Sequence, residues 1–521
     1  MNAKRRFLRS PGWGWKGAVA SLTLLVAWLP QGSALAQEPA DPPGLELPVV
    51  EDTLPNGMRF MVLTRPGAPT VSFVLRFDVG SVNEEPGRTG MGHLLEHLLF
   101  KGTTTIGSED LDRELALFPR IDAAEGLLAR ARAQDADSSV VDWLLQRARM
   151  LEDSAAEVAR PDAFTRILTE NGARNVNATT TYESTTFYMR LPANRAELWF
   201  VMEADRMANP VFRGFYTERD VVAEERRSRV ETTAAGALME AFYRTAYREH
   251  PYGVPVIGRM SDIESLQRAE VRRYHRRFYG PDNAVAAIVG DVDPGEVLRW
   301  ARKYFGPIPP AEKPAAVTTV EPPQQGERRV EVVSDAAPQI AMGWHVPSGY
   351  SPDMPALSVL SRLLAGGKTS RLYRRLVTEE DLAAWVSASV GPAFRYPQLL
   401  IIQAQPLDGV SSRRLEAAVY DELARLRREA PSPLEFRRVR NQLEVADVHR
   451  LASNLGLAFQ LAESAACYGD WRETFRSGQR IEAVTPDDVQ RVARVYLRPE
   501  NRTVATLVKP STSTATEGRR R

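Results

Sequence analysis

Two histidines and a glutamate lie within the five residues His93-Leu94-Leu95-Glu96-His97. The stretch contains no proline and is rich in leucine, a strong helix former, so it predicts a helix. In a helix His93 and His97 share one face, and Glu96 lies beside the second histidine. Two imidazoles one turn apart can bind one Zn²⁺, and a neighbouring carboxylate can take a proton from water on the metal. The pattern therefore predicts a metal centre with a general base.

The alternative is that these histidines are ordinary core residues of an apolar helix. Histidine is scarce in this chain, with 6 in 521 residues. A chance match to the H-x-x-E-H order should occur only on the order of once in a few hundred chains of such composition. The leucines of the segment occupy its other faces and can hold it in a core. We therefore expect a metal-binding helix.

A second stretch combines core-like spacing with acidic residues. Its helical stripe consists of Glu218, Val221, Val222 and Glu225. Residues at i, i+3, i+4 and i+7 usually face a core, yet an unpaired buried carboxylate is costly. A metal ion or buried hydrogen bonds would resolve this conflict. An exposed acidic helix is the alternative.

The elements around these residues can be predicted from their composition. A predicted strand at 71–79 leads into the predicted helix of His93 and His97 and would fix its position. A later segment rich in Ala, Leu, Arg and Glu predicts a helical hairpin, with helices near 109–133 and 138–158. The hairpin is interpreted as a surface elaboration, because charge-laced helical faces are usually solvated. An arm that docks a partner is the alternative.

The second part of the chain repeats the first without its chemistry. Predicted strands at 329–334 and 339–346 precede a predicted helix at 356–364. Aligning the leucine pairs that end the two helices puts other residues in place of the histidines and glutamate, namely Ser358, Ser361 and Arg362. A proline-rich segment without periodicity joins the two parts as a linker. The expected domains are 48–307, with a helical insertion at about 109–160, then the linker at 308–326, and 327–510.

Both chain ends are expected to lie outside the folded domains. Residues 1–36 have the pattern of a signal peptide, with a basic start, a short apolar stretch and the cleavage motif Ala34-Leu35-Ala36. Cleavage after Ala36 would give a periplasmic protein without a stable membrane anchor, and an uncleaved anchor is the alternative. The general secretory route is favoured over the twin-arginine route, whose pattern is poorly matched. Residues 37–47 and 511–521 are expected to be disordered.

Composition and cysteine content exclude several classes of protein. The chain is 43% hydrophobic and 26% charged, with a formal net charge of +1. This balance gives no electrostatic reason to bind nucleic acid or an anionic membrane. The only cysteine is Cys467, so an intrachain disulfide is impossible and a buried small residue is expected there.

The motifs resemble those of the insulinase/pitrilysin metallopeptidases, family M16 or inverzincins, and in particular the half-size bacterial branch that is similar to mitochondrial processing peptidase. The resemblance covers nearly the whole mature chain. It rests on the H-x-x-E-H helix, Asn177-Ala178-x-Thr180, Glu218-Arg219-x-Val221-Val222-x-x-Glu225, His250-Pro251-Tyr252, Val289-Gly290-Asp291 and 366–372. It implies an α+β fold of two homologous α/β-sandwich halves, each with helices packed on a mixed or antiparallel sheet. The halves would form a clamshell around an extended peptide, and the first half would carry the helical-hairpin insertion.

The resemblance also implies a role for each residue that matches a family motif. The ligands of one Zn²⁺ per chain would be His93, His97 and Glu225, and the catalytic base would be Glu96. Glu218 would be a further carboxylate that steadies a metal ligand. Asn177 and Ala178 would lie on the strand edge that takes the substrate backbone.

The sequence departs from the family pattern in two places. The third ligand usually follows the second histidine by about 75 residues, whereas Glu225 follows His97 by 128 (225 minus 97). The predicted hairpin lies between them and accounts for the excess. Members that act alone usually carry an Arg and a Tyr seven apart that help to hold substrate. Here the aligned positions are Val377 and Ala384, with Trp385 adjacent. A homologous M16-like partner subunit, itself without the H-x-x-E-H motif, would have to supply that pair.

The expected function is a zinc-dependent endopeptidase of the cell envelope that hydrolyses peptides or unfolded segments. It would use zinc-activated water, with Glu96 as general base. The alternative is a non-catalytic assembly or scaffold subunit of an M16-like complex. The presence of Glu96 opposes the scaffold, and the absence of the Arg/Tyr pair favours it.

Overall fold

The computed structural model describes residues 47–510. The predicted signal peptide at 1–36, the tail at 511–521 and all but the last residue of the lead-in at 37–47 lie outside these residues. Within the described part of the chain, no helix is both long and apolar enough to span a membrane.

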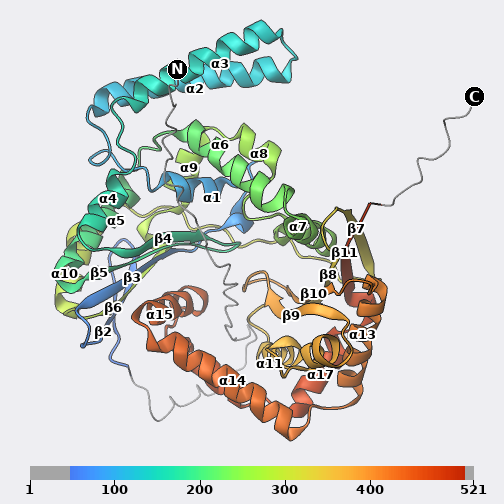
Figure 1. The fold of residues 1–521 in the computed structure, drawn as a ribbon. Coiled ribbons are helices and arrows are strands. Elements are labelled where there is room, and N and C mark those ends of the chain that lie inside the picture. Colours follow the sequence, from blue (N-terminus) through green and yellow to red (C-terminus); the bar gives the residue numbers. More distant parts are fainter. Residues whose placement is uncertain (1–46, 511–521) are drawn as a thin grey trace, which may run out of the picture.

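Residues 47–510 contain two sheets (Figure 1), and apart from the additional edge strand β1 the two have the same strand order. The first is ordered β1-β2-β6-β3-β5-β4 and the second β7-β11-β8-β10-β9. The first sheet consists of β1 (Val50–Thr53), β2 (Arg59–Thr64), β3 (Thr70–Phe77), β4 (Arg174–Thr180), β5 (Thr185–Pro192) and β6 (Ala284–Gly290). The second consists of β7 (Arg328–Val333), β8 (Gln339–Val346), β9 (Ala383–Gly391), β10 (Gln398–Pro406) and β11 (Arg502–Val508).

Strand directions confirm that the halves are repeats. β2 pairs with β6 in parallel, as β7 does with β11. The other pairs that the two sheets share are antiparallel: β3 with β6 and β5, β4 with β5, and their counterparts β8 with β11 and β10, and β9 with β10. The predicted α+β class with two similar halves is therefore confirmed.

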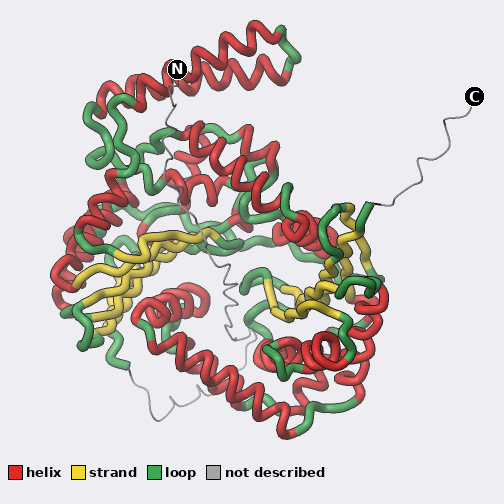
Figure 2. Tube along the Cα trace, in the orientation of Figure 1, coloured by secondary structure: helices red, strands yellow, loops and turns green. Residues whose placement is uncertain are grey.

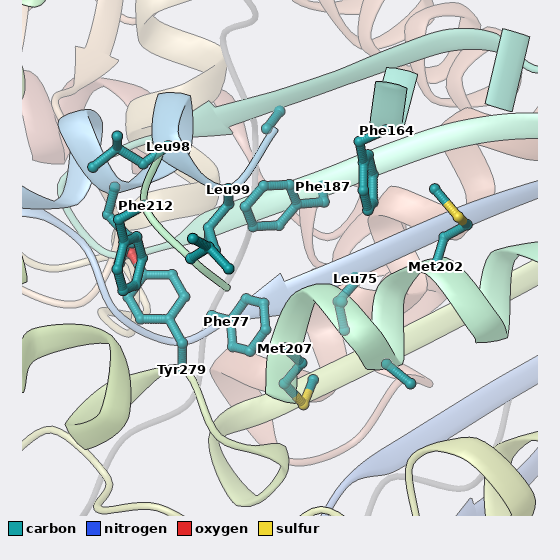
Figure 3. Close-up of a cluster of buried hydrophobic side chains, with 14 of the residues drawn as sticks. Leu75, Phe77, Leu98, Leu99, Phe164, Phe187, Met202, Met207, Phe212 and Tyr279 are labelled. Carbon is teal, nitrogen blue, oxygen red and sulfur yellow. The ribbon is translucent and has the colours of Figure 1, made fainter. Parts of the chain in front are cut away.

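Helices of the first half cover one face of its sheet. They are α1 (Met91–Leu98), α4 (Ala163–Glu170), α5 (Ala196–Ala208), α6 (Phe215–Arg226), α8 (Met260–Ser265), α9 (Arg268–Phe278) and α10 (Pro294–Tyr304). In the core beneath them, Phe73 of β3 stacks on Trp199 of α5, with ring centroids 4.9 Å apart. Leu98 and Leu99, at the end of α1, lie in the same core near Phe187 (Figure 3). The metal helix is thus anchored by apolar packing.

Helices of the second half cover its own sheet and enclose a separate core. They are α11 (Met354–Ala365), α12 (Arg371–Tyr373), α13 (Ser412–Arg428), α14 (Pro433–Ala452), α16 (Glu473–Glu482) and α17 (Pro486–Tyr496). α11 lies between β8 and β9 in the chain, as α1 lies between β3 and β4. Side-chain caps at Ser432 and Thr485 begin α14 and α17.

One helix from each half packs on the sheet of the other half. α15 (Asn454–Tyr468) packs on the free face of the first sheet, where Leu461 joins Met61 and Val74 in one buried cluster. α7 (Ala234–Ala246) packs on the second sheet, where Phe242 lies against Gly343 of β8. β3 is therefore covered on both faces, which agrees with the burial of every residue from Val71 to Phe77.

The predicted hairpin is formed by α2 (Leu111–Ala133) and α3 (Ser138–Ala156). It projects from the body of the molecule on the side of α6 (Figure 2). Near its tip, Leu128, Ala131 and Leu144 form a small core of their own. The base of the hairpin instead joins the main core of the first half through Phe118 and Ile121.

Candidate metal centre

The residues before α1 fix where the metal helix begins. Gly90 has a left-handed backbone (φ 87°), and a Cβ there would lie 2.5 Å from the carbonyl oxygen of Ile257. The Glu84 carboxylate accepts hydrogen bonds from the backbone N–H groups of Gly90 and Gly92, each at 2.7 Å. Burial raises the pKa of Glu84 to about 8, although these hydrogen bonds oppose the shift. The Glu84 side chain therefore accepts from two backbone N–H groups at the start of α1.

α6 lies against α1 and brings two carboxylates to the histidine face. Val222 is fully buried and Glu218 is 9% exposed, as expected for a core-facing stripe. Val221 is 46% exposed, so the prediction that it faces the core is wrong. Arg226 is buried instead, and it donates to the carbonyl oxygen of Gly258, just before α8.

His93, His97 and Glu225 converge on one point. One ligand atom from each lies within 4.8 Å of the others. The Nε2 atom of His93 is 3.9 Å from Glu225 Oε1, and Nε2 of His97 is 3.5 Å from Glu225 Oε2. Two imidazole nitrogens and one carboxylate are a donor set that suits zinc with one position left open. No other such group of three occurs among residues 47–510.

The protonation of His93 also fits a ligand, which must be neutral to bind a cation. Burial, helped by the charges of His97 and Arg229, lowers the pKa of His93 to about 3. The imidazole is therefore neutral at physiological pH. Its Nε2 can then offer a lone pair to a metal ion that Glu225 also binds.

Glu218 holds the far side of His97. Its Oε2 atom is 3.5 Å from His97 Nδ1, and its Oε1 atom is 2.5 Å from Lys101 Nζ. Burial alone would raise the pKa of Glu218, but its contacts with His97 and Lys101 outweigh burial and lower it. An ionised Glu218 can accept a proton from His97 Nδ1, an arrangement that leaves Nε2 for a metal. Nothing in the sequence pattern identified Lys101.

Glu96 is held by a threonine of β4. The hydroxyl of Thr180 donates a hydrogen bond to Glu96 Oε2. Burial raises the pKa of Glu96, and the hydrogen bond from Thr180 opposes that shift. Thr180 was part of a matched motif but had no predicted role. The period-2 alternation of a strand was the available signal, because it puts Thr180 on the same face as the buried Ala178.

Asn177 and Ala178 lie on β4, which is an edge strand of the first sheet. The amide nitrogen of Asn177 donates to the hydroxyl of Tyr188 at 3.2 Å, and Tyr188 packs against Phe459 of α15. The Asn177 side chain thus faces α15, away from Glu96. Only the backbone edge of this residue can belong to the same site as the base.

Glu225 also pairs with a cation that follows it in the chain. Arg229 Nη1 lies 2.5 Å from Glu225 Oε1, and the Arg229 side chain is 68% exposed. Arg229 belongs to the π-helical segment η3 (Arg227–Glu231) that continues α6. Its i, i+4 spacing from Glu225 is a signal that the sequence analysis did not use.

The second half lacks the corresponding chemistry. Val377 lies in the π-helical segment η6 (Arg374–Glu379), packed against the second core, and Ala384 lies on β9. Trp385 donates its indole N–H to Gln405 at 3.0 Å. β9 is an edge strand, like β4. Neither aligned position offers a guanidinium or a phenol.

Sequence models of known families match most of the chain. The model described as "Insulinase (Peptidase family M16)" matches residues 59–118 and 148–259, and "Peptidase M16 inactive domain" matches 265–443. The matched segments together exceed half of the chain. This protein belongs to peptidase family M16. The stretch missing from the family model, 119–147, falls within the hairpin.

Individual M16 relatives agree with this assignment. The zinc protease PqqE of Helicobacter pylori is 28% identical over 339 residues, and the alignment covers 64% of each chain, so just under two thirds of PqqE is spanned. An uncharacterized zinc protease of Streptomyces coelicolor is 26% identical over 458 residues, which cover 85% of this chain and 86% of that protein. The crystal structure of a protease from Helicobacter pylori has a TM-score of 0.74 at 24% identity, covering 89% of this chain and 99% of that one. This last comparison shows the shared fold.

Proposed function

We propose that this M16 protein is a zinc-dependent endopeptidase that hydrolyses peptides or unfolded polypeptide segments. The observation that carries the proposal is the approach of two histidine Nε2 atoms to one Glu225 carboxylate, at 3.9 and 3.5 Å. Glu96 lies on the same helix, one residue before His97. An arrangement of ligands with an adjacent base has no evident purpose in a purely structural subunit.

The residues divide the work of hydrolysis among them. His93, His97 and Glu225 would hold one Zn²⁺ per chain, which when bound supplies a Lewis acid that activates water and polarises a carbonyl. Glu96 accepts the proton of the attacking water and returns it to the departing amine. Because the pKa of Glu96 is raised toward neutral pH, its carboxyl group can both accept and release a proton more readily. Thr180 holds that carboxylate in one orientation.

The edge of β4 supports binding of an extended substrate. An edge strand offers unpaired N–H and C=O groups to which a peptide can add as a further strand. Asn177 and Ala178 lie on this strand, and Thr180 at its end contacts Glu96. A peptide paired with β4 would therefore pass beside the base. Folded proteins cannot add a strand in this way, which limits substrates to flexible chains.

A second subunit would complete the site. Val377 and Ala384 stand where an Arg and a Tyr would be needed to hold substrate and stabilise the developing oxyanion. We therefore propose a hetero-oligomer with a homologous M16-like subunit that carries the pair and lacks the H-x-x-E-H motif. Export to the periplasm is proposed from the pattern of residues 1–36.

The competing function is a non-catalytic scaffold subunit. The missing Arg/Tyr pair and the match of 265–443 to a domain described as inactive favour it. A quenched fluorogenic peptide assay on the full chain, with and without candidate M16 partners, separates the two functions. Wild type should cleave with its partner, and Glu96→Gln should not. If both are equally silent with every partner, the scaffold function is correct.

A further inference from the structure

The base of the helical hairpin contacts α6, the helix that carries Glu218 and Glu225. The Tyr216 hydroxyl donates to Asp122 Oδ1 at 3.0 Å. Arg219 Nη2 donates to Glu125 Oε2 at 3.2 Å. Both donors lie on α6, and both carboxylates lie on α2. α6 thus lies between the hairpin and the candidate metal centre (Figure 1).

The two sides of α6 carry different residues. Glu218, Val222 and Glu225 follow the i, i+4, i+7 spacing on the side of α1. Tyr216 and Arg219 are three apart and lie on the side of α2. A helix held on both sides cannot rotate or shift without breaking contacts on one of them. The rotation of α6 in turn decides whether Glu225 faces the histidines.

The contacts with the hairpin are partly buried and electrostatic. The side chains of Arg219 and Glu125 are 13% and 12% exposed. Arg268, 2% exposed, lies 3.5 Å from Asp122 Oδ1 and packs over the ring of Phe118 at 3.9 Å. Among the described residues, Asp122 is the one carboxylate that forms an ion pair with Arg268. Removing the partner of a buried cation is costly, so the hairpin carboxylates stabilise Arg219 and Arg268 in their buried positions.

A third contact connects α2 to the loop after α1. Glu114, at the start of α2, pairs with Arg213 at 2.8 Å, and both side chains are 1% exposed. Arg213 donates to the carbonyl oxygen of Lys101 at 2.8 Å. Lys101 in turn holds Glu218. The hairpin base therefore reaches the surroundings of His97 by two routes.

We propose that the proximal part of the hairpin, through Asp122 and Glu125, positions α6 and thereby Glu225, and that the distal part has no share in this. Asp122 and Glu125 lie in the stretch that the family model does not match. These contacts to α6 are therefore made by residues outside the matched family segments. The inference deepens the proposed zinc site and rests on it for its catalytic consequence.

The test compares two double variants of the full chain with equal loss of charge. Asp122→Asn with Glu125→Gln removes the contacts to α6. Asp135→Asn with Asp142→Asn removes two exposed carboxylates from the outer part of the hairpin and is the matched control. Hydrogen exchange of residues 215–226 is measured without metal, and Zn²⁺ affinity is measured by chelator competition.

In the first variant we expect faster exchange over 215–226 and about tenfold weaker Zn²⁺ binding, as for residues that orient metal ligands. The control should match wild type in both. Exchange and affinity equal to wild type in a folded first variant would overturn the proposal. If the double variant does not fold, Glu125→Gln alone decides, and exchanging charges with Glu125→Arg and Arg219→Glu should restore the affinity.

The two readouts also separate this inference from the proposed function. If wild type itself binds no Zn²⁺, the proposed metal site fails. The exchange rates over 215–226 still show whether the hairpin holds α6. If Zn²⁺ binds but the Asp122/Glu125 variant and the control behave alike, the metal site stands and only the positioning role is lost.

Discussion

Thr180 of β4 donates a hydrogen bond to Glu96 of α1, so a residue of the edge strand holds the base of the metal centre. The strand proposed to bind substrate and the group proposed to move protons are therefore in direct contact. This contact would place a peptide bound along β4 next to Glu96.

Thr180→Val keeps the shape of the side chain and removes its hydroxyl. A hydrogen bond to a charged group contributes about 1.5 kcal/mol or more, so kcat/KM should fall about tenfold while Zn²⁺ content stays the same. Steady-state kinetics on a fluorogenic peptide measure the change. Thr180→Ser is the control and should retain most activity. Full activity in Thr180→Val would show that the contact does not matter for the base.

Arg229→Ala should strengthen Zn²⁺ binding. Arg229 occupies Glu225 Oε1 at 2.5 Å and so competes with a cation for that carboxylate. The gain should be only a fewfold, since the Arg229 side chain is 68% exposed and exposed pairs contribute about 1 kcal/mol or less. Chelator competition measures it. Arg227→Ala is the matched control because Arg227 pairs with Glu224 outside the site, and equal affinities in both variants would contradict the prediction.

Glu152 of α3 should make stability depend on pH. Burial, followed by the nearby carboxylates of Glu125 and Asp220, raises its pKa from an ordinary 4.5 to about 7. The folded protein thus holds this proton more tightly than the unfolded chain, and stability falls as pH rises from about 4.5 to about 7. Glu152→Gln should match the Tm of wild type at pH 4 and exceed it at pH 8. The exposed Asp153→Asn on the same helix should show no such crossover, and a Glu152→Gln Tm that follows wild type at both pH values would be inconsistent with this account.

Gly343→Ala should disturb the packing of α7 on the second sheet. A Cβ at this position would lie 2.4 Å from Cζ of Phe242, which is fully buried. Overpacking of this kind costs about 1–3 kcal/mol, visible as a lower Tm. Adding Phe242→Leu should recover part of the loss. Gly326→Ala, where no atom lies within 4 Å, is the control and should leave Tm unchanged.

The local features of the site could be predicted from the sequence because they depend on helical periodicity. His93 and His97 share a face in any helix, and leucines on the other faces anchor it. Glu225 lies 128 residues beyond His97 and was assigned through a spacing pattern together with the family resemblance. The two-sheet repeat was visible in the second half because its strands and helix follow in the same order.

The contacts that could not be predicted all depend on tertiary packing. Lys101 reaches Glu218, and Thr180 reaches Glu96, across more than 80 residues in each case. Val221 was placed in the core from its spacing alone, whereas the buried face of α6 is turned toward Arg226, which donates to Gly258. The hairpin helices could be read from composition, but their carboxylate contacts with α6 could not.

The central claim is that three side chains from α1 and α6 form one zinc site beside Glu96. The most direct test is the Zn²⁺ content of the purified full chain after dialysis against a weak chelator, compared among wild type, Glu225→Ala and Glu96→Gln. The account predicts one Zn²⁺ per chain in wild type and in Glu96→Gln, and loss of the metal in Glu225→Ala. Full Zn²⁺ content in Glu225→Ala, or none in wild type, would contradict it.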